Sequence, residues 1–139
     1  MEQEELRRRF ASSVVARLAT VRTDGAPHVV PIVFAVVGDF VYTSVDDKPK
    51  RTRSLQRLAN LRHEPRCALL VDHYADDWSR LWWVRADGVA RVLDAPPVSH
   101  PGMVALRQRH GQYQRRPPSG PLVEITVETW SGWSGEVTT

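Results

Sequence analysis

Residues 14–44 read VVARLATVRTDGAPHVVPIVFAVVGDFVYTS, and this stretch decides the fold. It is rich in valine and isoleucine, and its first part alternates apolar and polar residues, as expected for a half-buried strand. Two turn signals, Asp24-Gly25 and Gly38-Asp39, divide it into three segments, at residues 14–22, 28–37 and 40–44. Three strands joined by two tight turns predict an antiparallel meander.

The rest of the chain predicts three short helices and three further strands. The predicted helices are residues 2–11, 51–62 and 98–110. The last of these can begin a few residues later, because of His100-Pro101-Gly102 near its start. The predicted strands are residues 66–74, 81–93 and 122–129, and Gly88 inside the second marks a bulge or a bend. Six strands with a few short helices indicate a mainly β (α+β) fold, a closed or half-closed antiparallel barrel without exposed edges.

The chain has 139 residues, a length that fits one domain spanning residues 1–139. Its longest uncharged apolar stretch, residues 29–37, is too short to span a bilayer, and no apolar segment of the secretory type follows the acidic N-terminus. A single cysteine, Cys67, excludes an internal disulfide and fits a reducing compartment, so we expect a cytoplasmic protein. The net charge of +3 and the scattered arginine clusters favour a small anionic ligand over nucleic acid.

The basic segment after the third strand is a candidate phosphate site. Four cations, Lys48, Lys50, Arg51 and Arg53, follow the hydroxyls of Thr43-Ser44 and precede a predicted helix. Hydroxyl and amide donors, cations and a helix N-terminus together favour a bound phosphate. The alternative is a solvated helix start with Asp46 and Asp47 as local counter-ions.

An aromatic cluster, made of Tyr74, Trp78, Trp82 and Trp83, is the second candidate. Trp82 and Trp83 are adjacent on a predicted strand, so their side chains point to opposite faces. One ring can fill the core or a dimer contact while the other stacks on a planar ligand. The five histidines show no metal-ligand spacing, Cys67 fits a small buried side chain, and no nucleophile motif is present, so no metal and no catalytic residue is assigned.

A series of motifs covers most of residues 12–134 and includes ATVRTDGAPHVVP at 19–31, YTS at 42–44, KPK at 48–50 with Arg53 and Leu55, and PRCALLV at 65–71. In the order and spacing of these motifs, the chain resembles the pyridoxamine-phosphate-oxidase-like split β-barrels, in their deazaflavin-dependent branch. DHY at 72–74, DW at 77–78, LWWVR at 81–85 and WSGW at 130–133 resemble a mycobacterial and actinobacterial subgroup.

The resemblance implies a homodimer with two cofactor clefts between its subunits. It places the cofactor phosphate on Thr43, Ser44, Lys48, Lys50 and Arg51. The cofactor ring would lie against Val29, Val30, Pro31 and Ile32. Residues of the partner subunit would cover it: Tyr74, Trp78, Trp82 and Arg85.

The implied cofactor is the deazaflavin coenzyme F420, with flavin mononucleotide (FMN) as the alternative. The implied function is an oxidoreductase that transfers a hydride between the deazaflavin and a small organic acceptor. The alternative is a non-catalytic carrier of the cofactor. Five tryptophans are many for a 139-residue barrel to bury alone, which also favours a dimer, unless the helices cover these rings within one chain.

Overall fold

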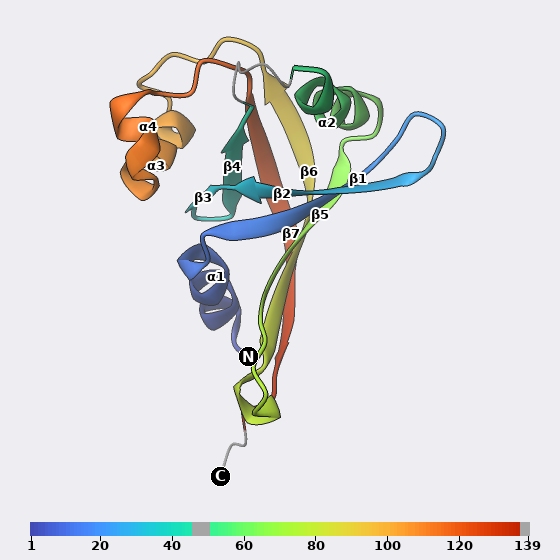
Figure 1. The fold of residues 1–139 in the computed structure, drawn as a ribbon, viewed down its shortest axis with the longest axis vertical. Helices are drawn as coiled ribbons and strands as arrows, with labels where there is room; N and C mark the ends of the chain where they lie inside the picture. Colours follow the sequence, from blue (N-terminus) through green and yellow to red (C-terminus); the bar gives the residue numbers. More distant parts are fainter. Residues whose placement is uncertain (46–50, 137–139) are drawn as a thin grey trace.

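The computed structural model describes residues 1–45 and 51–136, and of residues 51–55 it describes the backbone alone (Figure 1). The helices are α1 (Gln3–Ser12), α2 (Arg51–His63), α3 (Pro101–Arg109), α4 (Gly111–Arg115) and the 3-10 turn η1 (Trp78–Arg80). The strands are β1 (Val15–Val21), β2 (Pro27–Val33), β3 (Ala35–Val37), β4 (Phe40–Ser44), β5 (Arg66–His73), β6 (Trp82–Leu93) and β7 (Leu122–Ser134).

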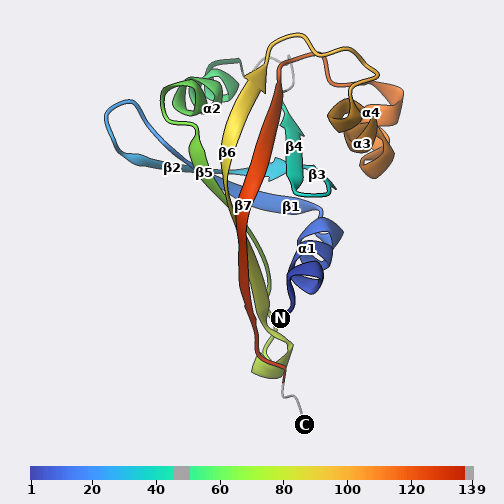
Figure 2. The ribbon, with the colours of Figure 1, turned by 180° about the vertical axis from the view of Figure 1, so that it is seen from behind.

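The described strands form one curled antiparallel sheet, a half-barrel, in the order β2-β1-β5-β6-β7-β4-β3. The two edge strands, β2 and β3, are consecutive in the chain and are separated only by Phe34. The backbone therefore joins the two edges of the sheet. Figure 2 shows β7 along the length of the molecule, with α1 beside its lower half and α2, α3 and α4 around the wide end.

The sheet has seven strands in the described residues, so the expectation of six was wrong. The predicted strand 28–37 breaks at Phe34, whose side chain is buried and packs against Phe10 with ring centroids 4.9 Å apart. The carbonyl oxygen of Phe34 lies 2.7 Å from Nε2 of His110. The half before the break is β2, which pairs with β1, and the half after it is β3, which pairs with β4. Two hairpins at opposite edges of the sheet therefore form in place of the predicted three-stranded meander.

The pairing of β6 with β7 is irregular where the sequence predicts a bulge or a bend. The register with β7 shifts between Asp87 and Gly88, whose partners are Thr129 and Val127. A Cβ atom at Gly88 would overlap the Thr126 carbonyl oxygen, which explains glycine at this point. Strand β7 continues to Ser134, five residues beyond the predicted end at Thr129.

The helices follow the predicted ranges in part. The third begins at Pro101, because Nδ1 of His100 accepts a hydrogen bond from the Gly102 N–H and caps it. Helix α4 was not predicted, since it is only five residues long and is anchored by one buried side chain, Tyr113. No helix among the described residues is long and apolar enough to cross a membrane.

Trp130 is buried within the chain, so it needs no second subunit to cover it. Phe10 of α1 packs edge-on against its ring at 5.2 Å, and its Nε1 donates to Asp39 at 3.1 Å. Arg7 pairs with the same carboxylate at 2.7 Å. Hydrogen bonds from Trp130 and Arg7 lower the pKa of Asp39. The N-terminal helix thus covers this ring, as the single-chain alternative anticipates.

Candidate functional site

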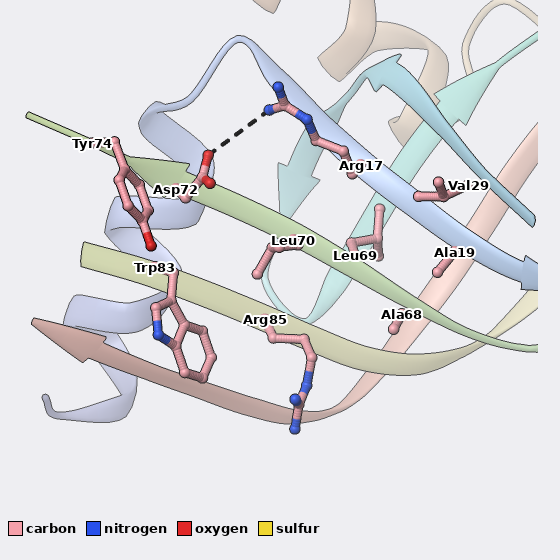
Figure 3. A pocket seen from close by; sticks show the side chains of 10 residues that line it. All are labelled: Arg17, Ala19, Val29, Ala68, Leu69, Leu70, Asp72, Tyr74, Trp83 and Arg85. Carbon is pink, nitrogen blue, oxygen red and sulfur yellow. Dashed lines mark ion pairs between the residues drawn. The ribbon is translucent and has the colours of Figure 1, made fainter. Parts of the chain in front are cut away.

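A groove of about 460 Å³ lies on the outer face of the sheet, across β2, β1, β5 and β6 (Figure 3). Alternate residues of a strand share one face, so residues two apart on each strand line it together. The lining residues are Arg17, Ala19, Val29, Ala68, Leu69, Leu70, Asp72, Tyr74, Trp83 and Arg85. Most of this surface is apolar, with charged groups at its margins.

Strand register arranges these side chains in rows across the groove. Val29, Ala19 and Ala68 are successive partners on β2, β1 and β5, and the two alanines form a low floor. The small side chains explain why the surface is hollow at this point. Both alanines also line an adjoining hollow of about 370 Å³ that reaches Pro27 and Arg66, so the depression continues along β1 and β5.

Aromatic rings stand at the other end of the groove. Trp83 on β6 pairs in register with Asp72 on β5, and Figure 3 shows the Tyr74 and Trp83 side chains at the same end of the groove. Tyr74 is 74% exposed, so its ring face is open to a ligand or to another chain. An aromatic wall beside an apolar floor suits a planar ring system.

Two arginines supply positive charge to the groove. Leu70 on β5 pairs in register with Arg17 on β1 and with Arg85 on β6. The two arginines therefore flank Leu70 in one row across the three strands. Each has a carboxylate partner, Asp72 at 3.9 Å and Asp87 at 3.0 Å respectively. These ion pairs are about half exposed, and such surface pairs contribute little stability. An anionic ligand can therefore compete for either guanidinium.

The structure brings some of the predicted ring-contacting residues to the groove and places others elsewhere. Val29, Tyr74 and Arg85 line it. Trp82 lies on the opposite face from Trp83, where it packs against the core and Arg9 covers its ring at 5.5 Å. The cofactor contact predicted for Trp82 stays a prediction, but the tryptophan in this groove is Trp83.

The remaining predicted ring contacts lie around the groove. On β2, Pro31 is exposed on the outer side, in the same row as Arg17, whereas Ile32 is buried and Val30 packs against the core. Trp78 is 77% exposed on η1, outside the groove lining. These contacts stay predictions.

The predicted phosphate residues lie at the end of β4 and beyond it. Thr43 and Ser44 are buried, and their hydroxyls donate to the main-chain oxygens of Val33 at 2.8 Å and Pro121 at 3.1 Å. These hydroxyl hydrogens would have to be released before they could bind a phosphate. Lys48 and Lys50 lie outside the described residues, as does the side chain of Arg51, so their roles stay predictions.

Sequence reasoning missed Arg17 and Asp72 as groove residues, and of the two adjacent tryptophans the resemblance assigned the cofactor contact to Trp82 and not to Trp83. Alternation shows that residues 17 and 19 share a face, but the sequence does not tell which face of a two-sided sheet carries the hollow. The prediction for Cys67 is confirmed, since this thiol is buried and burial raises its pKa to about 12. Among the described residues, no group of three His, Cys, Asp or Glu side chains is placed to hold a metal ion.

A family model described as "Pyridoxamine 5'-phosphate oxidase" matches residues 2–134. The chain belongs to this family. The match spans nearly all described elements, from α1 to the end of β7, and it confirms the family to which the sequence motifs point. No curated protein sequence matches the chain.

Solved structures share the fold over nearly the whole chain. The conserved hypothetical protein Rv2991 from Mycobacterium tuberculosis is 24% identical, with a TM-score of 0.77, covering 97% of this chain and 86% of its own. An FAD-binding protein from Mesorhizobium loti is 22% identical, with a TM-score of 0.72 and coverages of 95% and 92%. A protein described as an F420 reductase is 20% identical, with a TM-score of 0.67 and coverages of 94% and 98%. At these identities the likeness shows the fold.

Proposed function

We propose that the protein binds coenzyme F420 in a cleft shared by two copies of the chain, and that it is an oxidoreductase. The observation that carries this proposal is the groove on the outer sheet face, with its alanine floor, its aromatic end and its two arginines. A volume of about 460 Å³ is within the range of small-molecule and cofactor sites. An F420 reductase and an FAD-binding protein of the same fold support a flavin-type ligand.

The groove suits a deazaflavin in three respects. The flat ring system has two apolar faces, for which Trp83 and the alanine floor offer contact. The cofactor's phosphate and acidic tail carry negative charge, which Arg17 and Arg85 attract. The depression continues past Ala19 and Ala68, so an elongated ligand has room beyond the ring. FMN, which shares the ring shape and the phosphate, is the alternative.

The homodimer rests on the apolar side chains that this face leaves open. Exposed large apolar residues on the outer side of β1, β2, β5 and β7, or directly after β5, are Val15, Val21, Val29, Leu70, Tyr74 and Trp133. A gathered apolar surface of this kind marks an interaction site. A second copy placed about a two-fold axis would cover it and would turn the open groove into a cleft. Trp78, 77% exposed at the tip of the sheet, would then meet the partner.

Hydride transfer is chemistry that the bound cofactor supplies, and the protein contributes orientation and exclusion of water. The side chains of Val29, Leu70 and Trp83 would hold the ring in place, and the partner subunit would exclude solvent from its exposed face. A dedicated acid or base is not required for such a role. We propose a small organic molecule as acceptor, with a non-catalytic carrier as the alternative function. The buried free Cys67 suits a reducing cytoplasm, which we propose as the location.

Fluorescence titration of the purified protein with F420 and with FMN tests the cofactor. We expect micromolar or tighter binding of F420. Tight binding of FMN alone would contradict the choice of cofactor. Incubation of the complex with reduced F420 and a panel of quinones, nitroaromatics, enones and tetrapyrroles then separates an enzyme from a carrier, since a carrier would show no turnover with any acceptor.

A further inference from the structure

A second hollow, of about 380 Å³, lies beside the start of β1 and the end of β2, where α3 gives way to α4. Its lining includes Val14, Val33, Arg109, His110, Gly111 and Tyr113. It shares no lining residue with the groove of the proposed cofactor site. Its volume lies within the range of small-molecule sites. We call this hollow the α3–α4 pocket.

Arg109 brings a positive charge to the α3–α4 pocket. Its Nη2 atom donates to the main-chain oxygens of Ser12 at 3.4 Å and Ser13 at 3.2 Å, at the end of α1. Nε and Nη1 make no hydrogen bond with the residues that the structure describes, and no carboxylate of those residues forms an ion pair with Arg109. Residues 95–121 contain four arginines and no aspartate or glutamate. The guanidinium therefore keeps donors and charge for an anion.

His110 forms a fixed wall of the same pocket. Its Nε2 lies 2.7 Å from the Phe34 carbonyl oxygen, which can only accept, so Nε2 carries a proton. Its ring packs edge-on against Tyr113, with ring centroids 5.9 Å apart. These two contacts fix the orientation of the imidazole. A bound anion would favour the protonated ring, in which Nδ1 becomes a second donor while the bond to Phe34 is kept.

Two valines supply the apolar part of the pocket. Val14 is 56% exposed, and Val33 is partly buried against the core beneath α3. Covering these side chains removes apolar surface from water, which favours binding of a ligand with an apolar body. The pocket thus offers apolar contact and one guanidinium to the same molecule.

We infer that the α3–α4 pocket binds a small organic carboxylate. The carboxylate oxygens accept hydrogen bonds from the Arg109 guanidinium, whose planar donors match them, and the apolar body of the ligand covers Val14 and Val33. The inference does not depend on the proposed cofactor, because the two cavities have no lining residue in common.

Benzoate is the probe, with benzamide as its neutral counterpart and inorganic phosphate as an anion without an apolar body. Each is titrated into the full chain without cofactor, and the NMR signals of the Val14 and Val33 methyl groups are followed. We expect benzoate to shift these signals saturably, with a Kd on the order of 1 mM. Benzamide and phosphate should bind about tenfold more weakly or less. Absence of a saturable shift with benzoate would overturn the inference, as would equal Kd values for benzoate and either of the other probes.

Arg109→Gln tests the charge. It should weaken benzoate binding by about tenfold or more, the effect of losing hydrogen bonds to a charged group. Arg107→Gln is the matched control, because Arg107 lies on the same helix but bonds to the Val98 carbonyl oxygen and does not line the pocket. The control should bind benzoate within about twofold of wild type. An unchanged Kd in Arg109→Gln would contradict the assignment.

Gly111→Leu tests the pocket without touching the bonds from Arg109 to α1. A Cβ atom at Gly111 would meet no other atom within 4 Å, so the added side chain begins in open space. The melting temperature of this variant should not fall, because leucine is a better helix former than glycine. Benzoate binding should weaken by about tenfold or more, since the leucine occupies part of the pocket. Wild-type affinity in Gly111→Leu, with the same shifts at Val14 and Val33, would overturn the inference.

Discussion

Trp82 and Trp83 are adjacent in the chain, yet the structure predicts that their removal has opposite consequences. Trp83 faces the groove, and Trp82 packs against the core and under Arg9. We expect Trp83→Ala to weaken cofactor binding and to leave the free energy of unfolding nearly unchanged. We expect Trp82→Ala to lower the free energy of unfolding and to affect binding only through that loss.

The magnitudes follow from what each ring touches. Stacking of aromatic rings is worth about 0.5–1.5 kcal/mol beyond area burial, and lost apolar contact raises the total for Trp83→Ala to about 1–3 kcal/mol. This corresponds to a Kd roughly 5- to 150-fold higher. A fully buried tryptophan replaced by alanine costs about 3–5 kcal/mol, so the partly buried Trp82 should cost about 2–3 kcal/mol, including its contacts with His73 and Arg9.

The assay is cofactor fluorescence titration for Kd, together with urea denaturation of the ligand-free proteins. Trp83→Phe serves as the control, because it keeps an aromatic face and should restore most of the affinity. The reasoning is refuted if Trp82→Ala weakens binding at unchanged stability while Trp83→Ala leaves Kd as it was. That result would place the cofactor on the face of the sheet that carries α1.

Three further predictions test particular contacts. Gly88→Ala should lower the free energy of unfolding by about 1–3 kcal/mol in urea denaturation, because its Cβ would overlap the Thr126 carbonyl oxygen; a neutral result would contradict the tight bulge. Hydrogen bonds from Trp130 and Arg7 lower the pKa of Asp39 in the folded protein. The ionised carboxylate should therefore stabilise the fold at a pH above the usual carboxyl pKa, and this stabilisation should be lost as the pH falls through the pKa of Asp39 in the folded state. In a plot of Tm against pH, Asp39→Asn should reduce the fall of Tm at acid pH. An unchanged fall would show that other carboxylates cause it. Cys67, with a thiol pKa raised to about 12, should react with iodoacetamide at pH 8 only when urea unfolds the protein, and fast labelling of the native protein would show that the thiol is accessible.

Local pattern in the sequence predicts most strands because alternation and turn residues act over a few neighbours. The hairpin at Asp24-Gly25 and the bulge at Gly88 are such features. The break at Phe34 cannot be predicted from neighbouring residues, because residues 28–37 form one continuous apolar stretch in the sequence. It depends on Phe10 and His110, which are distant in the chain and pack against Phe34 only in the fold.

The candidate site is predicted less completely for the same reason. Adjacent tryptophans must face opposite sides, but the side that carries the groove depends on which strands become neighbours. The floor arises because Ala19 and Ala68 meet in register across β1 and β5, a pairing that no local motif encodes. From the sequence, Trp130 is likewise expected to be an exposed ring near the chain end. In the fold, Phe10 of α1 packs against it.

The account's central claim is an F420 site completed by a second copy of the chain. Sedimentation velocity of the protein with F420, followed at both the cofactor and the protein absorption bands, tests this claim most directly. The account predicts that the cofactor sediments with a species of twice the 15.8 kDa chain mass, at one cofactor per chain. A monomer of 15.8 kDa that carries F420 at full occupancy would contradict it, as would a dimer from which F420 separates at micromolar concentration.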